Sequence, residues 1–428
     1  MRPIRVLIDA RMCDGRPSGV SRYVTRIIRE LRRDDAITPV ALCGKEVSDE
    51  LVAYGVELCP TDFDRPVRPI HRRSCWERDR LASIIAHAGV DLYHATWNTG
   101  IPRRCPVPAV LTIHDLIPLW DLAEYFPSRL HRWSYAVSLH TSVRRAAHIV
   151  TVSNSVRNDC IRRLHIAADR ITAIHNGVDA GGSASDPDLV RRDYCLYVGG
   201  AERRKNIAAV FQAMDRLWRG GKGVRDLLPE SPEVCCVQKV PDTFSTPGLW
   251  LTGTLDGQCP AARTAYASLK HPDRVTFLGM PDDRRLGVLM ASARALLMLS
   301  TAEGFGLPAA EAMAHGCPVV VSDRASLPEV VGDAGLIVDP DDPDAVARAV
   351  LRVARDETLR TELIGRGLDR VTTLSWTQAA RQTAAIYQAA VTDCGTKRRG
   401  RIGQLLDELG RSRRLYQRAG PDGIAEAY

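Results

Sequence analysis

The sequence predicts an α/β protein with two doubly wound domains. Short apolar runs alternate with helical segments along the chain, and this alternation starts again after residue 187. Such alternation is typical of parallel strands joined by crossover helices. The chain of 428 residues is also too long for a single hydrophobic core. We therefore expect two domains that face each other across a cleft, where small-molecule sites commonly lie.

The first half of the chain begins with a predicted strand at 4–9, a loop that contains Gly19, and a helix with apolar residues at helical spacing. A glycine-containing loop between a strand and a helix could hold phosphate or an acceptor. Small residues and aspartates at 180–188 then indicate a boundary, so the first domain should span residues 1–180. Further strands are expected at 37–43, 54–58, 90–98, 109–120, 148–153 and 169–179, and helices at 76–88 and 128–147 and after an N-cap at Asn154 or Ser155.

Polar side chains end two of these strands. His94 and Trp97 lie at the end of the strand 90–98, and His114 and Asp115 lie in the segment 109–120. Residues at the carboxyl ends of parallel strands line the ligand crevice of such folds. These four residues are therefore candidates for a site. For His114 the alternative is a capping or core histidine that Asp115 holds in place.

The second half should form a domain at 187–375. Three consecutive cations, Arg203, Arg204 and Lys205, follow its first strand, and they could bind an anion or simply face solvent. Residues 219–248 show little periodicity and are expected to form an irregular insertion. Strands are expected at 195–200, 249–257, 275–280, 295–300, 318–322 and 336–340, and helices at 207–218, 308–315, 343–355, 357–368 and 376–391.

The stretch 295–323 carries the clearest chemistry. After its first strand, a loop holds Glu303, Gly304 and Gly306, and a helix begins at Pro308, which suits a first helical position. The free N–H groups of a helix start favour an anion such as phosphate. Glu311 is expected in the first helical turn, so it and Glu303 could face one ligand.

Two alternatives compete for this stretch. Glu311 could merely complement the helix dipole while Glu303 faces solvent. The spacing of Gly304, Gly306 and Ala309, with Asp323 ending the next strand, also matches a dinucleotide fingerprint, which would make the protein an NAD-dependent oxidoreductase.

Composition excludes several classes of protein. The first apolar run is too short for a signal peptide, and no run approaches the roughly 20 residues of a membrane span. The 12 cysteines are scattered, as expected for reduced thiols in a cytoplasmic protein. No histidine spacing predicts a metal site, and the Asp-x-Asp pairs at 62–64 and 339–341 are expected to be loop aspartates.

The net charge of +7 is unevenly distributed. Arginines line the helix after Gly19, and basic residues dominate the segment 393–428. That segment is expected to be a disordered tail or a basic helix that touches anionic lipid at the inner face of the membrane. Nucleic-acid binding is not expected, because aromatic residues do not interleave with the cations.

The segments TIHDLIP, ITAIHNGVD, YVGGAERRKNI and EGFGLPAAEAMAHGCPVVVSD, within matches that cover most of residues 4–392, resemble a known family. They are similar to the retaining GT-B glycosyltransferases of the glycogen-synthase and bacterial mannosyltransferase type, glycosyltransferase family four. The resemblance implies two Rossmann-like domains, with a C-terminal helix at about 376–392 completing the first. It also implies transfer of a hexose from a nucleotide-diphosphate sugar to a glycan or lipid-linked acceptor, in the synthesis of a surface polysaccharide or glycolipid.

The resemblance also assigns roles to residues. Glu303 would hold the transferred sugar, and Glu311 the ribose of the nucleotide. Lys205, helped by Arg204, would bind the diphosphate, and His114 would lie beside the sugar. The remaining donor contacts would come from Gly19, Gly304, Phe305, Gly306 and Leu307, with His94, Trp97 and Asp115 on the acceptor side.

The family's usual mechanism is front-face transfer without a metal or other cofactor, in which the leaving phosphate takes the acceptor proton. Many relatives carry an arginine where this chain has Gly200, so here the diphosphate charge must come from residues 203–205. The style of the motifs favours GDP-mannose as donor, with UDP sugars next. A nucleotide-sugar epimerase of the same architecture and an inactive sugar-binding relative are the other interpretations.

Overall fold

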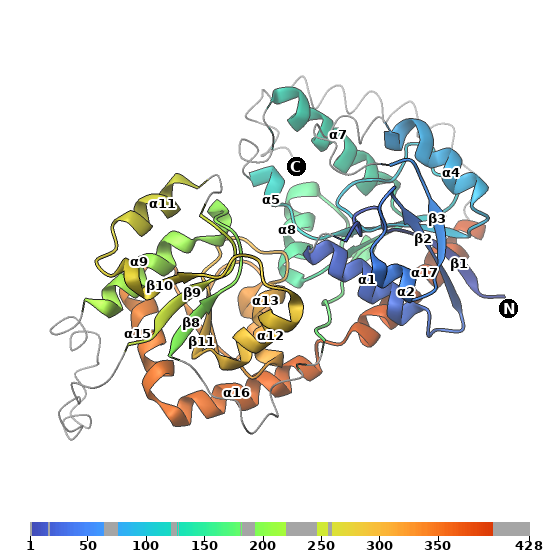
Figure 1. Ribbon diagram of the computed structural model, residues 1–428. Coiled ribbons are helices and arrows are strands. Elements are labelled where there is room, and N and C mark those ends of the chain that lie inside the picture. Colours follow the sequence, from blue (N-terminus) through green and yellow to red (C-terminus); the bar gives the residue numbers. More distant parts are fainter. Residues whose placement is uncertain are drawn as a thin grey trace. The chain divides into compact units, whose positions relative to one another are not determined.

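The computed structural model forms two compact units, which are described separately (Figure 1). Unit one contains the chain up to Gly177 together with the helix that starts at Trp376, and unit two runs from Val178 to Leu374. The structure describes residues 2–15, 18–63, 76–120, 126, 128–179, 181, 193–219, 246–255 and 259–396. Most of the expected insertion at 219–248 and of the basic tail at 393–428 lies outside these residues.

Unit one is built on a parallel sheet of seven strands in the order β3-β2-β1-β4-β5-β6-β7. The strand order reverses between β1 and β4, which is the switch point where ligands bind in doubly wound folds. The strands are β1 (Ile4–Asp9), β2 (Ile37–Cys43), β3 (Glu57–Pro60), β4 (Leu92–Ala95), β5 (Ala109–Ile113), β6 (His148–Thr151) and β7 (Ile171–Ala173).

Helices cover both faces of this sheet because strand residues alternate between the two sides. Val6 and Ile8 pack with the helices α1 and α17 on one face, whereas Leu7 packs on the other. Figure 1 shows the red helix α17 beside the blue helix α1, although they are far apart in the sequence. The helices of the unit are α1 (Gly19–Leu31), α2 (Asp49–Ala53), η1 (Glu77–Leu81), α4 (Ala82–His87), α5 (Ile117–Trp120), α7 (Arg129–Arg145), α8 (Asn154–Leu164), η2 (Ala168–Arg170) and α17 (Trp376–Thr396).

Unit two has a parallel sheet of six strands in the order β10-β9-β8-β11-β12-β13. Here the order reverses between β8 and β11. The strands are β8 (Tyr194–Tyr197), β9 (Gly248–Leu251), β10 (Val275–Phe277), β11 (Ala295–Met298), β12 (Val319–Ser322) and β13 (Leu336–Val338). The helices are η3 (Arg203–Lys205), α9 (Ile207–Trp218), α11 (Pro260–Ala267), η5 (Pro272–Arg274), α12 (Asp283–Ser292), α13 (Leu307–Ala314), α14 (Leu327–Val331), α15 (Pro343–Arg355) and α16 (Glu357–Thr372).

The two doubly wound sheets confirm the predicted fold class, but several element ends were predicted wrongly. The strand expected at 109–120 ends at Ile113, and residues Ile117–Trp120 form the short helix α5. The N-cap of α8 is Ser153, whose side chain accepts from the N–H of Val156, rather than Asn154 or Ser155. Sequence periodicity does not reveal such ends, because a short apolar run fits a strand or a helix turn equally well.

Candidate functional site

The switch point of unit two brings predicted site residues together. The loop after β8 carries Arg204 and Lys205, and the loop after β11 carries Glu303. Lys205 Nζ lies 2.9 Å from Glu303 Oε1, and Arg204 Nη1 lies 3.1 Å from the same oxygen. Arg204 also pairs with Glu202 Oε2 at 2.8 Å. Two cations and a carboxylate thus meet where a doubly wound sheet commonly binds its ligand.

The backbone fixes this cluster from both loops. Residues Arg203–Lys205 form a 3-10 turn that ends at Asn206, which takes the left-handed conformation at φ 51°. The N–H of Thr301 donates to the carbonyl of Arg204 at 2.8 Å, so the two loops are tied directly. The Lys205 side chain is only 11% exposed, and its stem runs over Gly199, where an added Cβ would lie 3.5 Å from Lys205 Cδ.

The charges of this cluster determine the protonation state of Glu303. Burial would raise the pKa of the Glu303 carboxyl, but the nearby charges of Lys205 and Arg204 outweigh burial and lower that pKa. Glu303 is therefore a carboxylate at neutral pH and accepts hydrogen bonds. Ser326 donates to the carbonyl of Glu303 at 3.1 Å and holds its backbone, a role that no local sequence pattern indicated.

The helix after this loop starts one residue earlier than predicted. Gly306 is the residue before α13 and has φ 95°, where an added Cβ would lie 2.6 Å from Leu327 Cδ2. This position needs glycine for its conformation and for the space that Leu327 fills. Because α13 begins at Leu307, Glu311 lies in the second helical turn, so its predicted place in the first turn is wrong. Glu311 is half-buried.

Phe305 differs from the neighbouring predicted donor residues. Its side chain is 4% exposed and belongs to the interior. A donor contact from Phe305 would therefore have to come from its backbone. Gly304 and Leu307 on either side are half-buried, so this loop remains a candidate.

In unit one, the structure places His114 just after β5 and holds it tightly. Its Nε2 lies 2.9 Å from the carbonyl oxygen of Thr96, and its backbone N–H donates to Asn98 Oδ1 at 2.9 Å. The Tyr23 ring and the imidazole pack in a T-shaped arrangement, with 5.0 Å between ring centroids. Burial lowers the pKa of His114 to about 4, although the Thr96 carbonyl acts in the opposite direction. His114 is therefore neutral at pH 7.

Asp115 does not hold the His114 ring, as the alternative interpretation required. Its Oδ1 accepts from the N–H of Ile117 at 3.1 Å and so supports the start of α5. Gly19 is exposed as the first residue of α1, next to the N-cap Ser18, and Trp97 is half-buried. The structure leaves the predicted roles of Gly19, Trp97 and Asp115 as predictions.

The prediction that His94 contacts an acceptor is wrong. His94 is completely buried, and burial lowers its pKa to about 3. Its Nδ1 lies 2.7 Å from the hydroxyl of Tyr387 on α17, and its Nε2 lies 2.8 Å from Thr112 Oγ1. The strand-end argument failed because His94 lies inside β4 and α17 covers this point of the sheet. His94 therefore fastens α17 to the core.

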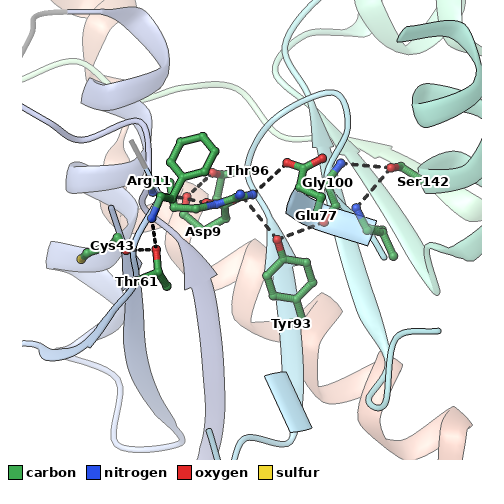
Figure 2. A network of polar contacts seen from close by, with 11 residues as sticks. Asp9, Arg11, Cys43, Thr61, Glu77, Tyr93, Thr96, Gly100 and Ser142 are labelled. Carbon is green, nitrogen blue, oxygen red and sulfur yellow. Dashed lines mark hydrogen bonds and ion pairs between the residues drawn. The ribbon is translucent and has the colours of Figure 1, made fainter. Parts of the chain in front are cut away.

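A second polar cluster lies under the switch point of unit one (Figure 2). The guanidinium of Arg11, 2% exposed, binds both oxygens of Asp9 at 2.6 and 2.8 Å and Glu77 Oε1 at 2.9 Å. The Tyr93 hydroxyl donates to Asp9 at 3.3 Å. Within this cluster, Arg11 Nη1 is buried and makes no hydrogen bond. No local sequence pattern indicated this cluster, since Glu77 is 66 residues from Arg11.

The described residues contain no group of three histidine, cysteine, aspartate or glutamate side chains placed to hold a metal ion. The Asp339 and Asp341 carboxylates both bind the guanidinium of Arg324, at 2.9 and 3.2 Å, as loop aspartates would. In the same part of the chain, no helix is long and apolar enough to cross a membrane.

The chain is similar in sequence to known glycosyltransferases. Residues 192–356 match the family "Glycosyl transferases group 1", and residues 17–181 match "Glycosyltransferase Family 4". Over 327 residues the chain is 34% identical to O-antigen chain mannosyltransferase B from Escherichia coli, covering 74% of this chain and 77% of that protein. It is 27% identical over 362 residues to O-antigen chain mannosyltransferase RfbU from Salmonella typhimurium, covering 79% and 92% respectively.

Solved structures share the same fold. A sucrose-phosphate synthase from Thermosynechococcus elongatus superposes with a TM-score of 0.68 at 18% identity, covering 91% of this chain and 100% of that chain. Anabaena Alr3699/HepE, solved in complex with UDP and glucose, superposes with a TM-score of 0.64 at 18% identity, covering 90% and 100%.

Proposed function

Because this chain belongs to the family-four glycosyltransferases, with the GT-B fold, we propose that it transfers mannose from GDP-mannose to an acceptor hydroxyl, with retention at the anomeric carbon and without a metal. The chain is a hexosyltransferase, and we place its reaction in the synthesis of a surface polysaccharide or glycolipid. The names of both curated relatives support mannose. The UDP and glucose bound to Alr3699/HepE support a nucleotide sugar and make UDP sugars the next donor to test.

The observation that carries the proposal is the contact of Lys205 and Arg204 with Glu303. During transfer, the bond from the anomeric carbon to the diphosphate breaks, and negative charge develops on the leaving group. Lys205 and Arg204 stabilise that charge as positioned cations. Glu303, as a carboxylate, accepts hydrogen bonds from hydroxyls of the transferred sugar. Glu311 accepts hydrogen bonds from the ribose.

The acceptor proton needs a base. In the proposed front-face reaction, the acceptor oxygen bonds to the anomeric carbon on the face that the diphosphate leaves, and an oxygen of the leaving diphosphate takes the proton. His114 is a weak base because its pKa is lowered to about 4. It therefore positions the sugar by hydrogen bonding rather than removing the acceptor proton.

The experiment that tests this function is a donor panel in the presence of EDTA. The purified protein is incubated with GDP-mannose, UDP-glucose, UDP-galactose and NAD, with and without a mannose-terminated lipid-linked acceptor. We expect acceptor-dependent GDP release from GDP-mannose that EDTA does not reduce. Loss of activity with EDTA would contradict a metal-free reaction. Isomerised donor without acceptor would identify an epimerase, and release from a UDP sugar alone would correct the donor.

We also propose that the protein contacts an anionic membrane surface when it meets a lipid-linked acceptor. The helix α7 supports this contact in addition to the basic tail. It has four arginines and no acidic residue, and three of its apolar side chains, Leu130, Trp133 and Val137, are 61, 43 and 41% exposed. These three residues lie on one face at helical spacing. Exposed apolar and cationic side chains together suit the interface of anionic lipids.

Vesicle sedimentation tests this contact. The protein should bind phosphatidylglycerol vesicles more strongly than phosphatidylcholine vesicles, and replacing Leu130 and Trp133 by serine should weaken binding about fivefold or more, because buried apolar area is lost. The control is Met280→Ser, which removes a side chain 80% exposed in unit two. Equal binding of all three proteins would contradict a role for α7.

A further inference from the structure

The side chain of Asn98 makes hydrogen bonds to the backbone that follows β5. Strands β4 and β5 pair in register up to Ala95 and Leu111. Past that point, the side-chain amide of Asn98 makes the hydrogen bonds that a paired strand would make. Asn98 Oδ1 accepts from the N–H of His114 at 2.9 Å, and Asn98 Nδ2 donates to the carbonyl of Asp115 at 2.7 Å. The amide, in a side chain only 4% exposed, thus satisfies the donor and the acceptor that a neighbouring strand would otherwise satisfy.

The same loop fixes the His114 ring. The contact of Nε2 with the Thr96 carbonyl requires Nε2 to carry the proton, because a carbonyl oxygen only accepts. Nδ1 of the neutral ring is then a hydrogen-bond acceptor. Asn98 holds the backbone of His114 through a hydrogen bond, and the Thr96 carbonyl holds its ring. Both the orientation and the tautomer of the imidazole therefore depend on residues 96–98.

The loop is itself rigidly held at both ends (Figure 2). The Thr96 hydroxyl donates to the carbonyl of Asp9. The N–H groups of Gly100 and Ile101 both donate to Ser142 Oγ, at 3.1 and 3.2 Å. Gly100 has φ 115°, and an added Cβ would lie 3.4 Å from Glu77 Oε1, so the loop end rests against the Arg11 cluster. Such support on every side is what a precisely placed group requires.

We propose that Asn98 is a positioning residue for sugar transfer, which holds His114 so that Nδ1 accepts a hydrogen bond from a hydroxyl of the transferred sugar. The inference rests on the proposed function, since it assumes that His114 contacts that sugar. Asn98 itself touches neither substrate nor leaving group and acts through His114.

The variant Asn98→Asp tests this inference. It keeps the size of the side chain and the oxygen that accepts from His114, but it replaces the Nδ2 donor by an oxygen that the Asp115 carbonyl repels. It also places a carboxylate beside the backbone N–H of His114, whose imidazole pKa is now governed by burial and the Thr96 carbonyl. Tyr23, His94 and Asp115 near His114 are unchanged, and so is Tyr135, whose hydroxyl accepts from Asn98 Nδ2 at 3.4 Å. A negative charge favours the imidazolium, so the sign of the shift is upward.

Three measurements are made on the full-length protein. Nitrogen-15 NMR gives the tautomer and the titration midpoint of His114 without any donor, steady-state kinetics with the active donor gives kcat and KM, and calorimetry gives the Kd of the nucleoside diphosphate. For Asn98→Asp we expect the His114 midpoint to rise by at least one pH unit. We expect kcat to fall about 10- to 100-fold and Kd to change less than twofold. The control Asn158→Asp, at an exposed position on α8, should change none of them.

Two outcomes of these measurements would overturn the proposal. A fall in kcat with an unmoved His114 midpoint would mean that Asn98 is only structural. A moved midpoint with unchanged kcat would mean that the placement of His114 does not matter for transfer. If the variant does not fold, the wild-type spectrum decides, because a proton on Nδ1 of His114 contradicts the assigned tautomer. Failure of the donor panel leaves the NMR result readable, so the two failures are distinguishable.

Discussion

Replacing Lys205 by alanine should lower kcat by about 30- to 1000-fold, or about 2–4 kcal/mol of transition-state stabilisation. The expected size is that of a lost preorganised donor to a developing anion. Lys205 fits this role because its side chain is largely buried and its Nζ lies 2.9 Å from Glu303. The charge is thus already placed before the donor binds, and no reorganisation is needed when the leaving group departs. The measurement is kcat and KM with the donor that the panel identifies.

Two further variants serve as a control and a comparison for Lys205→Ala. Lys270→Ala removes an exposed lysine of the same unit and should leave kcat unchanged. Glu311→Ala should act differently, weakening nucleotide binding and raising KM more than it lowers kcat, because the ribose contact is the same in the ground and transition states. Turnover of Lys205→Ala near the wild-type value would refute its role, and unchanged donor affinity of Glu311→Ala would refute the ribose assignment.

Replacing Arg11 by alanine should lower the free energy of unfolding of unit one by about 3–5 kcal/mol. The change leaves the carboxylates of Asp9 and Glu77 buried without their shared cation. It also removes the guanidinium from the rings of Phe63 and Trp76, 4.7 and 4.9 Å away. Urea unfolding, followed by a probe in unit one, measures the effect, since a chain with two units need not unfold in one step.

The matched control is Arg2→Ala. Arg2 pairs with Asp91 at 2.6 Å, but its side chain is 70% exposed, so its loss should cost less than about 1 kcal/mol. A triple variant, Arg11→Met with Asp9→Asn and Glu77→Gln, removes the charges together and should recover much of the stability. Similar losses for Arg11→Ala and Arg2→Ala would contradict the importance of burial.

Sequence reasoning succeeded where local patterns decide the structure. Buried strands such as β1 and β2 were predicted with their observed ends, because their apolar runs are bounded by polar or loop-forming residues. Lys205 and Glu303 were each predicted to follow a strand of the second domain, and the structure places them after β8 and β11, in contact with each other. The strand-end rule misplaced His94, since this residue lies inside β4 and a distant helix covers it.

The contacts that were missed depend on long-range geometry. Asn98 was visible as a polar residue near a strand end, but its role arises from how the loop after β4 lies along the loop after β5. The Arg11 cluster likewise needs Glu77 from another part of unit one. No periodicity or motif in the chain encodes such pairings, which is why they appear only in the folded structure.

The return of α17 to unit one has a consequence for synthesis on the ribosome. Tyr387, Ala384 and Ala380 belong to the same interior as the strand β1, yet all of unit two is translated between them. The nascent first unit must therefore wait, with His94 lacking its Tyr387 partner, while almost 200 residues emerge. At about 5–20 residues per second this wait is on the order of 10–40 s. During that interval the surface that α17 later covers, which includes β4, β5 and β6, is open to chaperones.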